Sequence, residues 1–113
     1  MQERFNKYLE KVNRSALISF DEERSLVSRI KAGGSDGESA KEILLDVNLR
    51  FVLSIAKDYM DKGLSLEEII EAGNDGMIKA AMDFPIERDI KFVSFSLSYI
   101  RKSIKRAINV SKL

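Results

Sequence analysis

The sequence predicts an all-α fold, a compact helical bundle in one domain. Apolar residues recur at helical spacing along most of the chain, and two of the periodic segments begin with a Ser-x-x-Glu capping box. The chain contains a single proline and few alternating runs of β-branched residues, which would indicate strands. Its 113 residues suffice for one modest core but not for two.

Two N-terminal helices are expected within residues 1–34. The first covers about residues 3–13, where apolar side chains share one face. Ser19 and Glu22 form the first capping box and start the second helix. The inward-facing residues of this second helix are Leu26, Val27 and Ile30. A glycine pair then ends it, and Gly33–Gly37 is expected to be a mobile loop.

Residues 35–82 are expected to form the middle helices of the domain. A third helix starts near Ser35 or Glu38, and Asn48 leaves open whether it breaks before the next apolar segment. Gly63 is expected to cap the C-terminus of that segment. The residues predicted to be buried in the two segments are Ile43, Leu44 and Val47, followed by Leu49, Val52, Leu53, Ile55, Ala56 and Tyr59.

The second capping box, Ser65 with Glu68, starts a helix that extends to about Met82. Its apolar stripe consists of Leu66, Ile69, Ile70, Met77, Ala80 and Ala81. Gly73 and Gly76 lie inside this helix, where each costs about 1 kcal/mol relative to alanine. Their spacing of three indicates that another backbone packs closely there, and a local bend is the alternative.

Residues 83–113 comprise a linker, fixed by Pro85, and a final helix of unusual charge. The last 24 positions, from Ile90, hold six of the 19 basic residues and none of the 18 acidic ones. The remainder of the chain therefore carries a formal charge of −5, although the whole chain carries +1. An acidic body with a basic last helix indicates an anionic partner at one end.

Laid out at 100° per residue, the final helix has three stripes. The stripe expected to face the core consists of Val93, Leu97, Ile100, Ile104, Ala107 and Ile108. The opposite, cationic stripe consists of Lys91, Ser94, Ser98, Arg101, Lys102 and Lys105, with Arg106 at its edge. Between them lie Phe92, Phe95 and Tyr99. Cations beside aromatic rings suit single-stranded nucleic acid, whose phosphates attract cations and whose unpaired bases stack on rings.

The composition excludes several kinds of function. Without cysteine or histidine, a zinc site, a thiol nucleophile and a histidine base are excluded, and no cofactor is expected. The acidic residues are scattered over predicted helix surfaces rather than gathered at an apolar pocket, so an enzyme is not expected. No apolar run approaches the roughly 18 to 20 residues that span a bilayer, and the lack of cysteine fits a cytoplasmic location.

The stretch NLRFVLSIAKDYMDKGLSLEEIIEAGNDGMIKAAMDF, Asn48 to Phe84, closely resembles the core-binding segment of primary-type bacterial sigma factors. Before it, YLEKVNRSALISFDEER and RIKAGG resemble the preceding segment of that family, and after it IKFVSFSLSYIRKSIKRAI resembles the promoter-melting helix. The resemblance implies a compact, non-enzymatic transcription initiation module that works in the cytoplasm at the nucleoid. Its implied partners are core RNA polymerase and the non-template strand of the minus-ten promoter element.

The same resemblance assigns residues to two surfaces. The helix after the GLSL turn docks in this family on a coiled coil of the largest polymerase subunit, with contacts that map to Glu68, Glu71, Ala72, Asn74 and Ile78. One flipped promoter base maps to a pocket of Phe84, Arg88 and Phe95, and a second to Leu17, Glu23, Asn48 and Arg50. The remaining expected DNA-facing residues are Lys91, Ser98, Tyr99, Arg101, Lys102 and Lys105.

Several of these positions depart from the family pattern. Phe95 replaces a tyrosine and keeps its stacking face. Ser98 and Tyr99 replace a tryptophan pair that wedges against the duplex, and serine cannot act as a wedge. Lys102 and Lys105 replace a glutamine and a threonine that read the first base pair. Lysine can instead hold a phosphate or a guanine edge.

Plainer interpretations remain open beside these. The basic stripe is also consistent with a solvated helix face, and the acids after the GLSL turn with an exposed face that favours the helix dipole. Core packing explains Phe92 better than contact with DNA does. For Phe95 and Tyr99 these two explanations are evenly balanced. Asn48 is equally well explained as a helix cap. Phe84, before Pro85, is expected to anchor the linker in the core.

Three function hypotheses follow. The first is a sigma-factor-like module that binds polymerase and melts the minus-ten element. The second, motivated by Ser98, is an interaction protein that keeps polymerase binding but lacks melting, and so competes with or modulates other sigma factors. The third is a helical nucleic-acid-binding domain unrelated to transcription. An anti-sigma factor is a further partner considered, and no membrane partner is expected. Without the family's downstream domains, the chain is expected to be a fragment or a naturally short factor.

Overall fold

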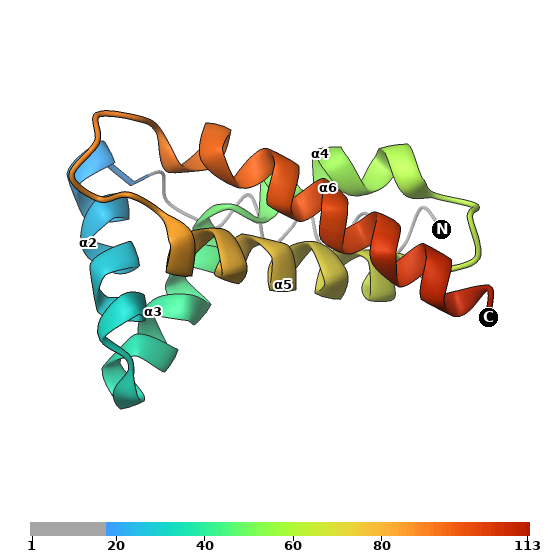
Figure 1. The fold of residues 1–113 in the computed structure, drawn as a ribbon, viewed down its shortest axis with the longest axis horizontal. Helices are drawn as coiled ribbons and strands as arrows, with labels where there is room; N and C mark the ends of the chain where they lie inside the picture. The colour runs from blue at the N-terminus through green and yellow to red at the C-terminus, as the bar shows by residue number, and fades with distance from the viewer. Residues whose placement is uncertain (1–17) are drawn as a thin grey trace.

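The computed structural model describes residues 18–113, which form helices joined by short connections (Figure 1). The helices are α2 (Phe20–Ala32), α3 (Gly34–Val47), α4 (Leu49–Ala56), α5 (Leu66–Asp83) and α6 (Phe92–Ser111), and a 3-10 turn covers Lys57–Tyr59. No strand occurs within residues 18–113, and the predicted all-α class is confirmed. The first helix that the sequence predicts, at about residues 3–13, lies outside the described residues.

The antiparallel pair of α5 and α6 runs along the length of the molecule (Figure 1). α2 and α3 form a hairpin that stands crosswise at one end of this pair, and α4 lies alongside it. α5 contacts α2, α3, α4 and α6. The core therefore forms around α5. The cationic stripe lies on α6 and the residues assigned to polymerase binding lie on α5, so both surfaces belong to helices that pack on this core.

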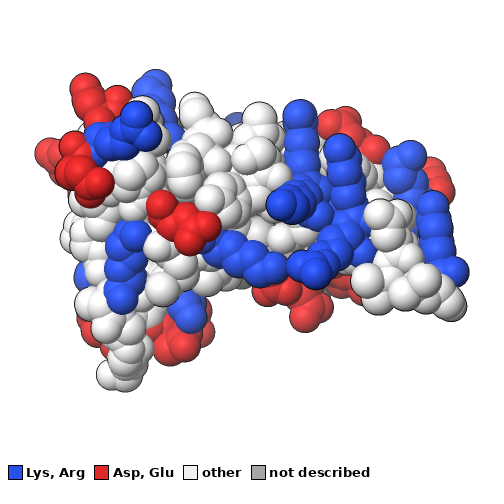
Figure 2. Space-filling model, viewed as in Figure 1, with Lys and Arg blue, Asp and Glu red and all other residues white. Residues whose placement is uncertain are grey.

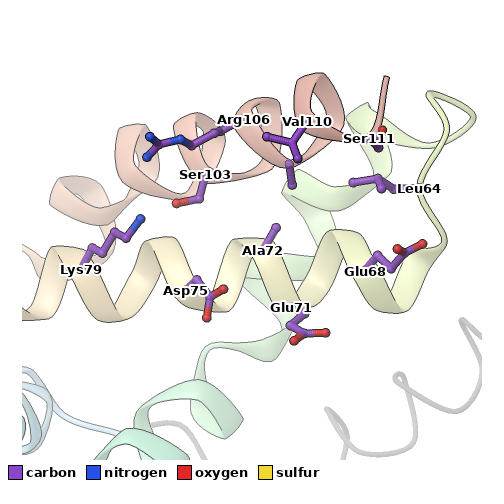
Figure 3. A pocket seen from close by; sticks show the side chains of 11 residues that line it. Leu64, Glu68, Glu71, Ala72, Asp75, Lys79, Ser103, Arg106, Val110 and Ser111 are labelled. Carbon is purple, nitrogen blue, oxygen red and sulfur yellow. The ribbon is translucent and has the colours of Figure 1, made fainter. Parts of the chain in front are cut away.

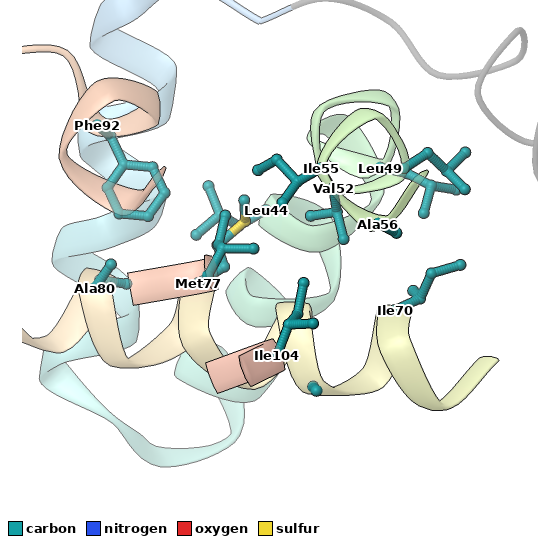
Figure 4. Packing of buried hydrophobic residues seen from close by; sticks show 14 of the residues in the cluster. Leu44, Leu49, Val52, Ile55, Ala56, Ile70, Met77, Ala80, Phe92 and Ile104 are labelled. Atoms are coloured by element: carbon teal, nitrogen blue, oxygen red, sulfur yellow. The ribbon is translucent and has the colours of Figure 1, made fainter. Parts of the chain in front are cut away.

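The core is a hydrophobic cluster, mostly aliphatic, to which helices α2 to α6 all contribute (Figure 4). Leu44, Val52, Met77 and Ile104 are fully buried and come from four different helices. Helices α2, α4 and α5 bury residues that the sequence predicts to be buried. These are Leu26, Val27, Ile30, Leu49, Val52, Leu53, Ile55, Ala56, Leu66, Ile69, Ile70, Met77, Ala80 and Ala81. Helical periodicity thus identified most of the core, because each of these helices buries one continuous stripe.

Both predicted capping boxes are present. Ser19 Oγ accepts a 3.1 Å hydrogen bond from the Glu22 N–H, and the Glu22 carboxylate accepts one from the Ser19 N–H. Ser65 and Glu68 make the same pair of bonds, at 2.9 and 3.1 Å, at the start of α5. The bond from each serine N–H lowers the pKa of its glutamate. Each box satisfies two N–H groups that a helix start leaves unpaired.

The mobile loop predicted at Gly33–Gly37 is wrong, because α3 begins at Gly34, directly after the cap of α2. Gly33 and Gly34 have φ of +79° and +74°, so two left-handed residues reverse the chain. Gly37 lies inside α3, where a Cβ would stand 3.0 Å from the Arg29 carbonyl oxygen. The hairpin is also closed by Arg29, whose guanidinium binds the Asp36 carboxylate at 2.8 to 3.2 Å.

The predicted burial of Ile43 is also wrong, since 42% of this residue is exposed. Val47 is half-buried, and Leu44 is fully buried as predicted. The close approach of Gly37 to α2 sets the rotation of α3, so that Ala40 and Leu44 follow it into the interface. Ile43, one position before Leu44, is turned toward solvent.

Asn48 breaks the third and fourth segments, a point that the sequence left open. Its side-chain Nδ2 donates a 2.9 Å hydrogen bond to the Leu44 carbonyl, which also accepts one from the Asn48 backbone N–H at 3.2 Å. The predicted C-cap at Gly63 is wrong, because α4 ends at Ala56 and passes into the 3-10 turn. Gly63, with φ of +106°, instead lies in the connection that leads to α5.

Of the two glycines inside α5, Gly76 packs against another backbone, as their spacing predicts, whereas Gly73 packs against side chains. A Cβ on Gly76 would lie 2.5 Å from the Tyr99 carbonyl oxygen and 2.8 Å from the Ile100 Cα. A Cβ on Gly73 would meet only side chains, at 3.1 to 3.5 Å, among them that of Val52. Only glycine at position 76 lets the two backbones pack at this distance.

The buried stripe of α6 agrees with the predicted one at Ile100, Ile104 and Ile108 and differs from it at the other positions. Residues four apart are buried, namely Phe92, Ser96, Ile100, Ile104 and Ile108. Val93, Leu97 and Ala107, predicted to face the core, are only half-buried. The shift follows from packing on Gly76, because a ridge of residues spaced by four fits the groove that the glycines leave. Small Ser96 is the second residue of the ridge, and its Oγ donates to the Val93 carbonyl at 2.9 Å.

Candidate functional site

The cationic stripe of α6 is exposed, as the sequence predicts. All of its members are solvent-exposed: Lys91, Ser94, Ser98, Arg101, Lys102 and Lys105, with Arg106 beside them. A shallow groove of about 410 Å³ follows the stripe and includes Leu97 in its lining. Figure 2 shows a band of Lys and Arg side chains across this part of the molecule. The stripe offers the chemistry that binds a phosphate backbone.

Aromatic rings line the junction between α5 and the start of α6. The Phe84 ring makes edge contacts with Phe92 and Phe95, each at 5.4 Å between centroids, and Phe95 lies 5.2 Å from Tyr99. Phe84 is 1% exposed and Phe92 is fully buried, so the core-packing interpretation is confirmed for both. Phe95 and Tyr99 are half-buried and leave part of each ring accessible beside the cationic stripe.

A hydrogen bond holds Tyr99 in this arrangement. Its hydroxyl donates to Asp83 Oδ2 at 2.9 Å. The bond raises the pKa of Tyr99, because the tyrosinate would lose its donor and face a carboxylate. Beside Tyr99 a groove of about 890 Å³ is lined by apolar Met82 and Val110 and by the cations Lys79, Lys102, Lys105 and Arg106, among others.

Sequence reasoning missed Arg24, whose guanidinium packs on the Phe84 ring. The Arg24 guanidinium carbon lies 5.4 Å from the Phe84 ring centroid and 5.0 Å from that of Phe20, so the cation is held between two rings. Arg24 Nη1 also donates to the Ile90 carbonyl at 3.5 Å. The spacing of four between Phe20 and Arg24 places them on one helix face. No local signal, however, indicated that Phe84 would close the other side.

The described residues that were predicted to form the second base pocket lie on different elements. Glu23, from α2, is half-buried; burial raises its pKa, and a hydrogen bond with the Phe92 backbone opposes the rise. This contact ties Glu23 to the first turn of α6. Asn48 is 7% exposed and acts as the helix cap that the sequence offered as an alternative, whereas Arg50 is exposed. Leu17 lies outside the described residues.

Arg88, assigned to the first pocket, belongs to the turn that leads from α5 to α6. Its backbone N–H donates to the Pro85 carbonyl at 2.9 Å, and the residue as a whole is exposed. Of that pocket, the structure therefore brings Phe84 and Phe95 into direct contact, whereas Arg88 is exposed in the turn.

The residues assigned to polymerase binding occupy neighbouring sectors of α5. Glu68, Glu71 and Ala72 line a groove of about 500 Å³ between α5 and α6 (Figure 3). Ala72 points toward α6, whereas the Glu71 carboxylate points away from it. Asn74 and Ile78 fall on the adjoining side of the helix at 100° per residue. The Asn74 Oδ1 atom is buried without a hydrogen-bond partner in the described part of the chain.

The α6 side of this groove was not predicted. It is formed by Ser103, Arg106, Ala107, Val110 and Ser111, and α5 adds Asp75 and Lys79. Within residues 18–113 no three acidic, histidine or cysteine side chains gather into a potential metal site. Nor is any helix of this part of the chain long and apolar enough to cross a membrane.

Comparison with known proteins relates the sequence to one family. Residues 44–112 match the model of sigma-70 region 2. The chain is 43% identical over 101 residues to RNA polymerase sigma factor SigA of Lactococcus lactis subsp. cremoris and 40% identical to SigA of Listeria monocytogenes. Each match covers 89% of this chain but only 28% and 26% of the relative. The chain thus spans about a quarter of the length of these relatives, and it belongs to the sigma-70 family through its region 2.

Proposed function

We propose that the chain is the promoter-binding and polymerase-binding module of a sigma factor and has no catalytic role of its own. In this proposal α5 docks on core RNA polymerase and α6 binds the non-template strand of the minus-ten promoter element. The relatives' name, RNA polymerase sigma factor, supports the choice of polymerase as partner. The observation that carries the DNA half is the exposure, on one helix, of a cationic stripe beside the half-buried rings of Phe95 and Tyr99.

The first base pocket has a physical basis in the aromatic contacts. Flipping a base out of the stack costs a few kcal/mol, which a stacking surface in the protein must offset. Phe84 is too deeply buried to offer a face to a base, but it holds the Phe95 ring from beneath through an edge contact. Phe95 then supplies the stacking face, and exposed Arg88 supplies the hydrogen-bond donors and charge.

The polymerase half rests on the acidic sector of α5. Glu68 and Glu71 are exposed there. A polymerase surface rich in arginine or lysine would complement this sector.

Fluorescence anisotropy with a labelled single-stranded oligonucleotide tests the proposal. The purified chain, mixed with core polymerase, should bind the minus-ten non-template strand more tightly than a scrambled strand of the same composition. Binding should fall with rising salt because lysines and arginines replace counterions. Equal affinity for the two strands would contradict the DNA half, and no retention of the chain on immobilised polymerase would contradict the other half.

A second candidate is a module that binds polymerase without opening promoter DNA and thereby competes with other sigma factors. It is favoured by the Tyr99–Asp83 hydrogen bond, which holds the larger of the two side chains at the wedge position against α5. Ser98, the other residue there, is exposed but small. A permanganate footprint on promoter DNA separates the candidates: reactive thymines near the minus-ten element support melting, and their absence despite polymerase binding supports competition.

A further inference from the structure

Phe20 is a large aromatic residue at the start of α2 that stays 40% exposed. Phe20 does not belong to the buried core cluster, and its ring contacts the Arg24 guanidinium. Arg24 lies between the Phe20 and Phe84 rings, at 5.0 and 5.4 Å from their centroids. A guanidinium fixed in this way is pre-organised, because the two rings and the bond to the Ile90 carbonyl restrict its rotamers.

The rings and the guanidinium form one continuous array. From Phe95 the steps to Phe84, to Arg24 and to Phe20 measure 5.4, 5.4 and 5.0 Å. The two ends of this array reach the surface, whereas Phe84 in the middle is buried. Since each strand of a duplex already advances about 3.4 Å per nucleotide, a few nucleotides of single strand cover the distance from Phe95 to Phe20.

We propose that Phe20 and Arg24 form an additional nucleotide subsite, in which Phe20 stacks on an unpaired base and Arg24 holds the adjoining phosphate. This inference rests on the proposed function, because it concerns the same DNA strand that binds at Phe95. An aromatic face accepts any base, and base stacking on such a ring is tolerant of sequence. The guanidinium retains N–H donors beyond the one directed at Ile90, and its planar fork suits phosphate oxygens.

The acids at the start of α2 limit how the strand can run. At 100° per residue, Asp21 and Glu22 stand 100° and 200° around the helix from Phe20, whereas Arg24 stands only 40° away. Phosphates are therefore expected on the Arg24 side, toward Lys91, which follows Ile90 in the chain. Glu23, on the remaining flank, has its carboxylate hydrogen-bonded with the Phe92 backbone.

Two substitutions at position 20 test the subsite in the complete chain bound to core polymerase. Phe20→Leu keeps an apolar side chain but removes the ring, and Phe20→Trp keeps a ring. The matched control is Ile43→Ala, which removes an apolar side chain of similar exposure, 42%, from α3. The probes are minus-ten non-template oligonucleotides that carry 2-aminopurine at one position at a time, so that loss of stacking appears as increased fluorescence at that position.

We expect Phe20→Leu to weaken binding about 5- to 100-fold and to increase fluorescence at a different nucleotide from the one affected by Phe95→Ala. Phe20→Trp and Ile43→Ala should bind like the wild type. Thermal unfolding of each variant by circular dichroism confirms that the fold is retained. Wild-type affinity and an unchanged fluorescence pattern in Phe20→Leu would overturn the subsite while Phe95→Ala still reports on the proposed function. Failure of the wild-type chain to bind the probes would overturn the proposed function itself.

Discussion

The Tyr99 hydroxyl donates a 2.9 Å hydrogen bond to the carboxylate of Asp83, the last residue of α5. The bond links the two helices next to the cationic stripe and orients the Tyr99 ring. It connects a residue assigned to DNA with one that sequence patterns did not single out.

Removing this bond should change stability in a pH-dependent way. Tyr99→Phe is expected to lower the melting temperature by a few degrees at neutral pH, because the Asp83 carboxylate loses a donor. The folded-state pKa of Tyr99 is raised above its usual value near 10. The contribution of Tyr99 is therefore fully present below pH 10 and is lost as pH rises through the folded-state pKa. Melting curves of both proteins from pH 7 to above 10 should converge at the alkaline end; a constant gap would contradict this assignment.

The two glycines of α5 should respond differently to alanine. Gly76→Ala forces a Cβ against the backbone of α6, at 2.5 Å from the Tyr99 carbonyl oxygen, and should cost about 2–3 kcal/mol of unfolding free energy. Gly73→Ala meets only side chains at 3.1 Å or more and gains up to about 1 kcal/mol of helix propensity, so its net change should stay within about 1 kcal/mol. Urea unfolding of the pair measures both. Equal losses would show that the backbone contact at Gly76 does not set the helix spacing.

Glu23 should lower stability at neutral pH through its partial burial. Because burial raises its folded-state pKa, its contribution to stability is present below the unfolded-state pKa, near 4.3, and is lost as pH rises through the folded-state pKa. Glu23→Gln, whose amide oxygen can still accept from the Phe92 backbone, should be more stable than the wild type at pH 7. The gain should remain under about 1 kcal/mol after solvent screening and should vanish below about pH 4. Chemical unfolding of both proteins at pH 7 and below about pH 4 measures the difference in unfolding free energy. A gain that persists in acid would contradict the assignment.

The cations of α6 should contribute to the salt dependence of DNA binding. Lys102 and Lys105 line the groove on the cationic stripe, so replacing both with alanine should reduce the slope of log affinity against log salt by about 1.4, or 0.7 per cation on a single strand. Lys112→Ala, which removes a cation from the C-cap of α6 outside this groove, serves as the control. Binding titrations over a range of salt concentrations supply the slopes. An unchanged slope in the double variant would place the strand elsewhere.

Reversing a charge on α5 should weaken polymerase binding without loss of the fold. Glu71 is exposed and outside the capping box, so Glu71→Lys should leave thermal stability almost unchanged and reduce affinity for core polymerase about tenfold. Glu42→Lys makes the same change on an exposed position of α3. Titration of labelled chain with core polymerase compares them. If the two variants bind alike, the docking surface does not include this part of α5.

Local rules predicted the parts of the fold that depend on neighbouring residues. The capping boxes at Ser19 and Ser65 and the apolar stripes of α2, α4 and α5 follow from spacing within one helix, and the structure has them. The errors arose where another element decides. Gly37, packed on the backbone of α2, set the rotation of α3 and exposed Ile43. At Gly76 the close packing similarly fixed the rotation of α6, which kept Ile100, Ile104 and Ile108 buried as predicted but buried Phe92 and Ser96 in place of Val93 and Leu97.

The same limit applies to the candidate site. Helical periodicity placed the cationic stripe correctly at the surface and left Phe95 and Tyr99 balanced between core and surface, and the structure has both half-buried. It could not reveal that Arg24 lies between Phe20 and Phe84, because that contact joins segments far apart in the chain. It also could not show that Tyr99 is bound to Asp83. Side-chain partners across helices depend on the rotation of both helices, which the sequence pattern of one helix does not define.

The backbone contact at Gly76 also has a mechanical consequence under the proposed function. No side chain separates the two backbones there, so a displacement of α5 would press directly on the backbone of α6. With the polymerase on α5 and the DNA on α6, docking would then bear on the angle at which the strand is presented.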